Sequence, residues 1–425
     1  MPHYCGYNSI DFMIRYLVKT NYDILIVGGG LIGQLAALAC AKIGNLSIAL
    51  IDGRDILNSE IYEQDGRAFA LSPSSVRLLN HLKIETDNLS QPIQDMLITD
   101  GEIGEENAWR LHFNSSSIPH DKIAEMIESR LLSVATLNRL KTESAITVIA
   151  PHFISDLIHD DSGVSGIVAG KKITADLLIA ADGAGSPIRK AAGILYEGRS
   201  YNQKSLVTTI AHSLPHEGLA VQRFLPGGPL AILPLIDQRS QIVWSDTSRA
   251  IEAACNLTEN DFLTELNHRI GGHLGDISLI APRQNYGLAL QIAQSVTAKR
   301  LALIGDAAHV IHPMAGQGLN LGLRDIAALY DVLKDARSVG RDIGGAALEN
   351  YASWRKTDVT ALAAATDGLS YLYNPANGPL SRPASKALAH LRRAGLSAIN
   401  ESEFLKTILM SEAAGVGNLQ PSLLT

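Results

Sequence analysis

The feature that most constrains the fold of this chain is a glycine-rich turn between two short apolar segments near its start. Residues 22–27 are rich in β-branched side chains, as in a strand, and Gly28-Gly-Gly-Leu-Ile-Gly33 follows at once. Residues 35–41 have helical character, and residues 46–51 form a second strand-like segment that ends at Asp52. A GxGxxG turn between strand and helix, with an acidic residue about twenty positions later, is typical of a dinucleotide-binding βαβ unit. We therefore expect a Rossmann-like α/β domain.

Each position of this turn has a different expected task. Gly28 makes the tight turn, Gly30 lets the backbone approach a pyrophosphate, and Gly33 allows close packing of helix against strand. Asp52 would bind the ribose hydroxyls. Arg54 could read a 2′-phosphate, but Asp52 argues against that role, so a surface position is the preferred interpretation.

Two later segments repeat the pattern of a buried strand that ends in a carboxylate. Residues 177–181 are apolar and precede Asp182-Gly183, which is either an ordinary turn or a cofactor contact. Residues 301–304 precede Gly305-Asp306, and a helical pattern begins near Leu319 after a loop rich in glycine. Asp306 can accept hydrogen bonds from a polyol, and the amides of residues 316–320 lie at the positive end of a helix.

The regions between these segments predict a second, antiparallel layer. Residues 206–245 contain four strand-like runs separated by turns, with Pro234 indicating an edge or a bulge. Residues 88–118 are turn-rich and also fit strands, and residues 145–174 fit a β-meander. Residues 120–134 read as a helix with inward-facing apolar side chains, namely Ile123, Met126, Ile127 and Leu131. Because acid or base side chains are scarce in the 206–245 region, we interpret it as a largely apolar platform.

Composition excludes several other classes of protein. The 425 residues carry a net charge of −7, so no general nucleic-acid footprint is present. The three cysteines are far apart and predict neither a disulfide framework nor a metal site, which favours a reducing, cytoplasmic setting. No apolar run is long enough for a membrane span. Residues 1–20 are interpreted as a loosely held extension without an assigned role.

The last part of the chain is expected to be helical. Residues 325–334, 346–372 and 384–393 have helical periodicity. In the last of these segments Lys386, His390 and Arg393 fall on one face. This face is either an ordinary solvated surface, which is the preferred interpretation, or a weakly basic patch for an anionic membrane surface.

Taken together and in order, GGGLIG, ADGAGSPIR and GDAAH…HPMAGQGLN resemble the cofactor motifs of FAD-dependent aromatic hydroxylases of the p-hydroxybenzoate hydroxylase type, over about residues 22–370. The wording of residues 312–320, together with residues 66–72, is similar more narrowly to the ubiquinone-biosynthesis hydroxylases. The resemblance implies a Rossmann-like FAD-binding domain of the GR2 type, an interleaved antiparallel substrate sheet and C-terminal helices. The implied boundaries are FAD-binding segments 22–87, 119–195 and 295–345, substrate segments 88–118 and 196–294, and a helical region 346–425.

The resemblance also implies a role for each motif residue. Gly28, Gly30, Gly33 and Asp52 would hold the ADP half of FAD, although most relatives have Glu where Asp52 stands. Arg67, which the sequence alone leaves open between solvent and cofactor, would contact the flavin side. Asp182 and Gly183 match a motif linked to FAD and NAD(P)H, Asp306 would bind the ribityl chain, and Pro313 would lie beside the flavin ring. The residues expected to face the flavin pyrimidine are Gly316, Gln317, Gly318, Leu319 and Asn320. For His309 and His312 a packing role is preferred over an acid–base role.

The implied reaction is hydroxylation of a phenolic ring with NAD(P)H and O2, through a flavin C4a-hydroperoxide and without a metal or an assigned acid or base. The narrower resemblance implies a lipophilic polyprenyl phenol of ubiquinone biosynthesis as substrate. It further implies peripheral contact with the inner membrane or membership of a biosynthetic complex, or a homo-oligomer. One alternative is a hydroxylase of a small aromatic acid, which needs a basic residue in the substrate sheet such as Arg223. The other is a non-catalytic FAD-binding assembly subunit.

Overall fold

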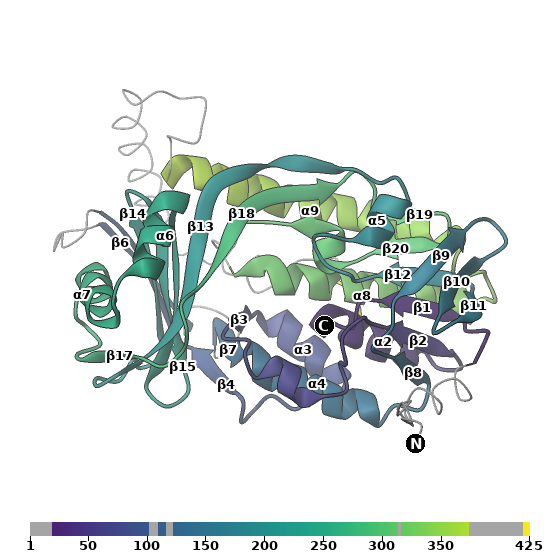
Figure 1. Cartoon of the computed structure of the whole chain (residues 1–425), viewed down its shortest axis with the longest axis horizontal. Coiled ribbons are helices and arrows are strands. Elements are labelled where there is room, and N and C mark those ends of the chain that lie inside the picture. The colour runs from purple at the N-terminus through teal and green to yellow at the C-terminus, as the bar shows by residue number, and fades with distance from the viewer. Residues whose placement is uncertain (1–18, 102–108, 116–121, 313–315, 374–419) are drawn as a thin grey trace, which may run out of the picture.

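The computed structural model describes residues 19–101, 109–115, 122–312, 316–373 and 420–425. Figure 1 shows two sheets at opposite ends of the molecule, with the long helices α8 (Gln317–Ser338) and α9 (Ala347–Tyr373) beside and between them. The predicted position of Pro313 and the predicted helix 384–393 lie outside the described residues. Among the described helices, none combines the length and the apolar character that a membrane crossing requires.

The first sheet is mostly parallel, and its strands come from four separate parts of the chain. Its order is β19-β20-β12-β1-β2-β8, and all neighbours are parallel except β19 and β20. The strands are β1 (Ile24–Val27), β2 (Ile48–Ile51), β8 (Ile146–Ile149), β12 (Leu177–Ala180), β19 (Thr297–Ala298) and β20 (Leu301–Leu303). Because parallel strands share one carboxyl edge, the loops after β1, β2, β12 and β20 meet there.

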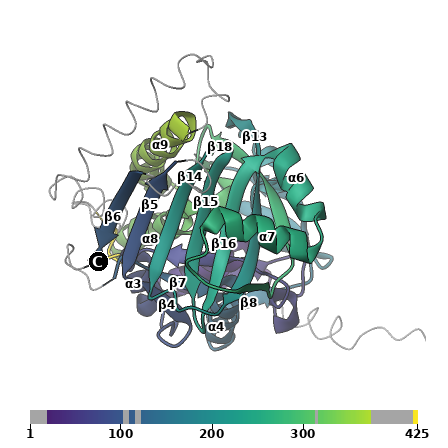
Figure 2. The same cartoon turned by 90° about the vertical axis from the view of Figure 1, so that its left-hand side faces the viewer.

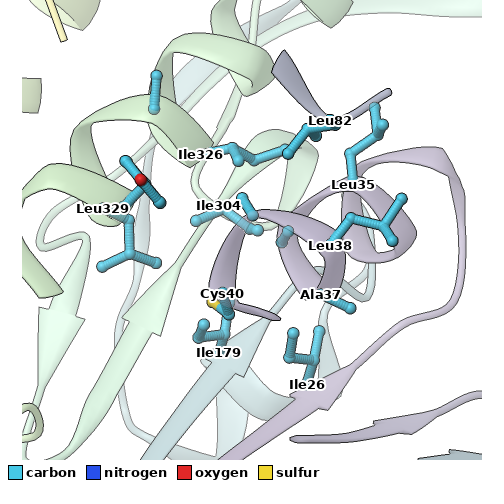
Figure 3. Close-up of a cluster of buried hydrophobic side chains, with 14 of the residues drawn as sticks. Ile26, Leu35, Ala37, Leu38, Cys40, Leu82, Ile179, Ile304, Ile326 and Leu329 are labelled. Atoms are coloured by element: carbon cyan, nitrogen blue, oxygen red, sulfur yellow. The ribbon is translucent and has the colours of Figure 1, made fainter. Parts of the chain in front are cut away.

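This sheet is covered on both faces, which explains why its strands are continuously apolar. Ile26 and Ile179 face the core formed with α2 (Leu31–Ile43) and α8, where Leu35 and Ile326 also lie (Figure 3). The neighbouring Leu25 points to the opposite face. That face is covered by a small antiparallel sheet of β9 (Ile154–His159), β10 (Val164–Val168) and β11 (Lys171–Ala175). The meander predicted over residues 145–174 is therefore confirmed, with β8 in the parallel sheet.

The second large sheet has nine strands and is mainly antiparallel. Its order is β21-β18-β13-β16-β15-β14-β5-β6, with β17 paired to β13. Helices α6 (Ser248–Asn256) and α7 (Glu259–Ile270) lie across its outer face (Figure 2), where Phe262 packs against Ile232 and Trp244 in one core. The strands are β5 (Asp95–Asp100), β6 (Trp109–Asn114), β13 (Tyr196–His212), β14 (Leu219–Leu225), β15 (Gly228–Leu235), β16 (Arg239–Thr247), β17 (Ile277–Leu279), β18 (Gln284–Ala293) and β21 (His309–Val310).

A small third sheet lies against the inner face of this large sheet and corrects one prediction. It consists of β3 (Ala68–Leu71), β7 (Ala124–Glu128) and β4 (Ser90–Ile93), with β7 in the middle. The helix predicted over residues 120–134 was therefore wrong in its first half, because helix α4 covers Ser129–Lys141 only. Met126 and Ile127 point into different cores, as the two-residue period of a strand requires. Pairing on both sides overrides the helical spacing of the apolar residues.

The remaining elements are short. They are η1 (Ser59–Tyr62), α3 (Pro73–His81), α5 (Pro187–Ala191) and η3 (Gly305–Ala307). Ser72 and Ser186 cap α3 and α5 as predicted, each followed by a proline at the first helical position. At Pro234 the neighbouring strand β14 pairs with β15 only as far as Ile232, so the proline lies at a local edge as expected.

The predicted α/β class with an interleaved antiparallel sheet is confirmed. Strands of the parallel sheet are separated in sequence by strands of the large sheet. The chain passes through β18 of the large sheet before it reaches β20 of the parallel sheet. Two strand pairings join segments that were assigned to different domains. Strand β4 of a predicted substrate segment pairs with β7 of a predicted FAD-binding segment. Strand β21 of a predicted FAD-binding segment pairs with β18 of the large sheet. Near the end of the chain Leu423 and Leu424 are buried in the core that α2, α3 and α8 share.

Candidate cofactor site

The turn after β1 leaves space for a ligand at one of its three predicted glycines. Gly28 has a φ of +106°, and a Cβ there would lie 2.3 Å from the carbonyl oxygen of Ala181. A Cβ on Gly33 would lie 1.7 Å from the carbonyl oxygen of Gly28. A Cβ on Gly30 would meet no atom within 4 Å. The protein's own packing therefore requires Gly28 and Gly33, whereas the space at Gly30 is open for an approaching group.

Asp52 is fixed at the end of β2 beside this turn. The Gly29 N–H donates to Asp52 Oδ2 at 2.6 Å, and the Arg54 N–H donates to Oδ1 at 2.7 Å. The Arg54 side chain is 62% exposed, as predicted, but its Nε lies 3.2 Å from Asp52 Oδ1. The carboxylate of Asp52 is thus held at the carboxyl edge of the sheet. That it binds a ribose stays a prediction.

Asp182 follows β12 at the same edge and carries a buried oxygen without a partner. Its Oδ2 accepts a hydrogen bond from the Ile188 N–H at 3.1 Å. Its Oδ1 is buried and has no hydrogen-bond partner among the described residues. Burial raises the pKa of Asp182. Since a buried acceptor without a donor is costly, this oxygen is suited to a hydroxyl or water that a ligand brings.

Asp306 lies in the turn after β20, at the fourth loop of this edge. It is exposed to solvent, yet the surrounding protein removes enough water to raise the pKa of its carboxyl group. Such a combination is expected of a carboxylate that lines an open site rather than a flat surface. Tyr196 holds the turn from one side, because its hydroxyl donates to the carbonyl oxygen of Asp306 at 2.7 Å.

A buried ionic network also holds this turn, and it was not predicted from the sequence. Asp325 Oδ2 accepts hydrogen bonds from the Gly305 N–H at 2.8 Å and lies 2.7 Å from His309 Nε2. Asp325 Oδ1 accepts from Arg355 Nε at 2.7 Å. Burial alone would raise the pKa of Asp325, but the charges of His309 and Arg355 outweigh it and lower that pKa. His309 is thus part of a buried ion pair, and its preferred packing role stays a prediction. The available signal was an acidic residue on the apolar face of α8.

Helices α2 and α8 both begin at this site with uncapped amides. Gly30 precedes α2 and Gly316 precedes α8, and neither first turn has a side-chain cap or an acidic residue. By contrast, α3, α5, α6 and α7 are each capped by a serine or threonine hydroxyl. Free amides at a helix start bind anionic groups. A Cβ on Gly318 would meet nothing within 4 Å, so this start is open as well.

The residues predicted to face a flavin do not all have free side chains. The Asn320 side chain is buried and bonds to Ser72, Ser75 and the carbonyl oxygen of Ala70. Gly316 and Gly318 are exposed, whereas Gln317 and Leu319 are half-buried. In this segment the backbone of the helix start is therefore the part available to a ligand. His312 is buried against Tyr201, with their rings 5.0 Å apart.

Arg67 lies just before strand β3, within the electrostatic range of Asp306. Its guanidinium pairs with Asp65 at 2.7 Å, and its side chain is half exposed. The hydrogen bond to Asp65, and then the charges of Asp65, Tyr286 and Asp306, raise the pKa of Arg67. Arg67 therefore feels the charge of Asp306, although its direct ionic partner is Asp65.

The inner face of the large sheet is mostly apolar. Ala220 and Leu235 pack against β3 and β7, which identifies the face that points toward the cofactor domain. Strand alternation places further residues on this face: the apolar Met96, Ile98, Phe224, Ala231, Leu233 and Val243, and the polar Asp100, Gln222, Gln241 and Ser245. Along β5, β14, β15 and β16 the one described cation on it is Arg239, which pairs with Glu128 at 2.8 Å.

Arg223, the predicted candidate for binding an acidic substrate, lies on the outer face. Arg223 lies on the same face of β14 as Val221 and Leu225, which pack in the core beneath α6 and α7. Its Nη1 donates to the carbonyl oxygen of Arg269 in α7 at 3.2 Å. A cavity of about 340 Å³ opens on this outer side, with His216 and His273 in its lining. None of the four turns at the carboxyl edge contributes to that cavity.

The chain is similar to known flavoproteins over nearly its whole length. Residues 21–366 match the FAD binding domain family. The ubiquinone hydroxylase UbiL of Rhodospirillum rubrum is 39% identical over 404 residues, covering 94% of this chain and 91% of that protein. The 3-demethoxyubiquinol 3-hydroxylase of Escherichia coli is 30% identical, covering 93% of this chain and 98% of that protein. Human ubiquinone biosynthesis monooxygenase COQ6 is 29% identical, covering 93% of both chains.

The solved structures agree in fold. The p-nitrophenol 4-monooxygenase PnpA of Pseudomonas putida superposes with a TM-score of 0.75 at 18% identity, over 94% of this chain and all of that one. The solved structure shows the fold, and the family match together with the hydroxylase and monooxygenase relatives makes this chain an FAD-dependent monooxygenase. The chain belongs to the FAD binding domain family, as the match over residues 21–366 shows.

The residues at the carboxyl edge fit FAD. Open space at Gly30 and the uncapped starts of α2 and α8 suit a dinucleotide with an anionic centre. The partnerless Oδ1 of Asp182 and the carboxylate of Asp306 are acceptors suited to its hydroxyl groups. Among the described residues, no group of His, Cys, Asp and Glu is arranged to hold a metal ion.

Proposed function

We propose that this enzyme hydroxylates the aromatic ring of a polyprenyl phenol in ubiquinone biosynthesis, with NAD(P)H and O2 as co-substrates. The observation that carries the proposal is the apolar inner face of the substrate sheet, whose one described cation along four strands is already paired. A neutral, lipophilic ring suits such a face, because an unpaired carboxylate there would lose its hydration without gaining a partner. Three relatives support the same substrate class: a ubiquinone hydroxylase, a 3-demethoxyubiquinol 3-hydroxylase and a ubiquinone biosynthesis monooxygenase.

We propose the following division of work among the site residues. Gly28, Gly30, Gly33 and Asp52 hold the ADP half of FAD, and Asp182 with Gly183 supports its centre. Arg67, Asp306, Pro313 and residues 316–320 position the flavin half. Bound FAD supplies the activation of O2 with electrons from NAD(P)H. The protein's own part is to orient the ring beside the flavin and exclude water, and the amides at the start of α8 stabilise negative charge there.

The proposed substrate lies in a membrane, which leads to a proposal about location. None of the described helices could span a bilayer. We therefore propose peripheral contact with the membrane, or membership of a biosynthetic complex or homo-oligomer, as the way the enzyme reaches its substrate. Flotation with vesicles that contain a prenylated phenol, compared with a sample without vesicles, tests the membrane contact directly.

The proposed substrate is tested by disrupting the gene and profiling quinone lipids by mass spectrometry. A prenylated intermediate that lacks one hydroxyl should accumulate while ubiquinone falls, and the wild-type gene should reverse both changes. The Gly30→Ala gene is the matched control, because it should not reverse them. An unchanged ubiquinone content, in cells with no redundant hydroxylase, would refute the proposal.

A hydroxylase of a small aromatic acid is the second candidate, and the structure gives it less support. It requires a cation on the inner face, whereas Arg223 points to α7 on the outer face. With purified enzyme, NAD(P)H oxidation should be stimulated by a prenylated phenol and not by a water-soluble benzoate. The opposite preference would favour the second candidate.

A further inference from the structure

We propose that Tyr196 is a positioning residue that couples the Asp182 turn to the Asp306 turn through its hydroxyl and its stacked partner Arg189. The proposal rests on the proposed placement of FAD at these turns. Tyr196 lies outside the three cofactor motifs, at the first residue of β13. Its side chain extends from the substrate sheet to the edge where the cofactor turns meet.

The hydroxyl of Tyr196 holds the backbone of the Asp306 turn. It lies 2.7 Å from the carbonyl oxygen of Asp306 and 3.2 Å from that of Ala307, so one O–H is shared between two acceptors. Tyr196 pairs with Ala293 in β18, and the Ala293 N–H donates to the carbonyl oxygen of Ala308 at 2.8 Å. The turn is therefore attached to the start of β13 by both a strand contact and a side chain.

The ring of Tyr196 contacts the Asp182 turn through Arg189. The Arg189 guanidinium carbon lies 3.4 Å from the ring centroid, and its Nη1 donates to the carbonyl oxygen of Ala184 at 3.2 Å. Arg189 is only 4% exposed, so this stack is shielded from water, where a cation–π contact is strongest. A single side chain thus touches one turn with its hydroxyl and the other turn through the stacked guanidinium.

The Tyr196 hydroxyl is protonated at neutral pH. Burial raises the pKa of Tyr196 to about 12, although the charge of Arg189 acts in the opposite direction. The hydroxyl therefore remains protonated and continues to donate to the Asp306 carbonyl. Losing it would leave two carbonyl oxygens without that donor, and the turn that carries the Asp306 carboxylate would be held less firmly.

The test uses full-length apoprotein and two probes, FAD and ADP. Under the proposed placement ADP contacts the Gly28–Gly33 turn and Asp52, whereas FAD also contacts the two turns that Tyr196 joins. Tyr196→Phe removes only the hydroxyl, and the Kd for FAD should rise about three- to tenfold, the effect of one lost hydrogen bond. The Kd for ADP should stay within about twofold of wild type, since its contacts are untouched. Arg189→Lys keeps the charge but loses the planar stack, and it should produce the same selective loss.

Combining the two changes tests whether they act through one connection. Tyr196→Phe with Arg189→Lys should raise the FAD Kd by less than the product of the single effects. Thr208→Val and Arg269→Lys are matched controls on the outer side of the large sheet. Thr208 also donates to a backbone carbonyl at 2.8 Å, and Arg269 also stacks on an aromatic ring, at 4.1 Å from Trp244.

Three results would overturn the proposal. These are an unchanged FAD Kd in Tyr196→Phe, a parallel loss of FAD and ADP binding, and an equal loss of FAD binding in the controls. A wrong substrate would leave all these binding results as expected. A wrong placement of FAD would instead appear as normal FAD binding by Gly30→Ala in the same assay.

Discussion

The side-chain oxygen of Asn320 accepts hydrogen bonds from the Ser72 N–H at 3.0 Å and from Ser75 Oγ at 2.7 Å, across 248 and 245 positions of sequence. Asn320 lies in the first turns of α8, and Ser72 caps α3. The buried side-chain amide of Asn320 therefore joins the start of α8 to the start of α3. Since α8 starts at the cofactor site, this contact fixes the direction in which its free amides point.

Replacing Asn320 with Ala should weaken both the fold and cofactor binding. The change leaves Ser72 N–H and Ser75 Oγ without their buried partner, which should lower the free energy of unfolding of the apoprotein by about 2–4 kcal/mol. Urea denaturation at pH 7.5 measures this loss, and FAD titration should show weaker binding. Asn80→Ala, at an exposed position of α3, is the matched control and should leave both quantities nearly unchanged.

Alanine substitutions at Gly30 and Gly33, which lie in one turn, should have different effects on protein stability and on FAD binding. Gly33→Ala places a methyl group 1.7 Å from the Gly28 carbonyl oxygen, so the apoprotein should be strongly destabilised or fail to accumulate. Gly30→Ala meets no atom, and the Tm of its apoprotein should match wild type, while FAD affinity falls at least about tenfold. Differential scanning fluorimetry and flavin fluorescence titration provide the two readouts. Equal effects of both changes on the Tm would contradict this interpretation of the turn.

Asp306→Asn should stabilise the apoprotein and weaken FAD binding at the same time. Surrounding protein raises the pKa of Asp306, so the ionised form is disfavoured in the fold at neutral pH, and a neutral amide removes that cost. The Tm of the apoprotein should therefore rise, whereas the Kd for FAD should increase at least about tenfold because a charged acceptor is lost. The Tm difference should disappear as the pH falls through the raised pKa and Asp306 becomes neutral as well. A lower Tm for the variant at pH 7.5 would argue against a strained carboxylate.

Asp325→Asn should be among the most destabilising changes in α8. The variant leaves Arg355, which is 2% exposed, with Asp358 as its remaining acidic partner, and a broken buried ion pair costs about 3–5 kcal/mol. Because His309 and Arg355 lower the pKa of Asp325, its contribution is complete above the unfolded value and is lost as the pH falls through the lower folded value. Urea denaturation from pH 6 down to about pH 3, which crosses the usual aspartate pKa of about 3.9, should show a steeper loss of stability for wild type than for the variant. Asp335→Asn, exposed on the same helix, is the control.

His212 should make the free energy of unfolding depend on pH in a second, higher pH range. Burial lowers its pKa, and its two ring nitrogens contact the Leu214 carbonyl oxygen and Ser240 Oγ. The unfolded state therefore binds a proton more readily, so stability should be complete above about pH 6.5 and fall below it. The slope from this group cannot exceed about 1.4 kcal/mol per pH unit. His212→Asn should flatten the profile between pH 7.5 and pH 5.5, and an unchanged slope would exclude His212 as its source.

The strand-end carboxylates and the glycines could be predicted because they follow from local sequence and one rule of parallel sheets. A strand that ends in Asp52 or Asp182 places its carboxylate at the shared edge whatever the rest of the chain does. The partners of Asn320 and Asp325 could not be predicted, because they lie in β3, α3 and α9, far away in sequence. The helix predicted for residues 124–128 was wrong for a related reason, because only their pairing with β3 and β4 distinguishes a strand from a helix there.

The interleaving of the two sheets determines the order in which this enzyme can be made. Strand β12 pairs with β20, yet all strands from β13 to β18 are synthesised between them. Until Leu303 leaves the ribosome, β12 has an open apolar edge, which is the kind of surface that templates aggregation. The apolar edge of β12 can therefore be closed only after the strands of the substrate sheet from β13 to β18 have been synthesised.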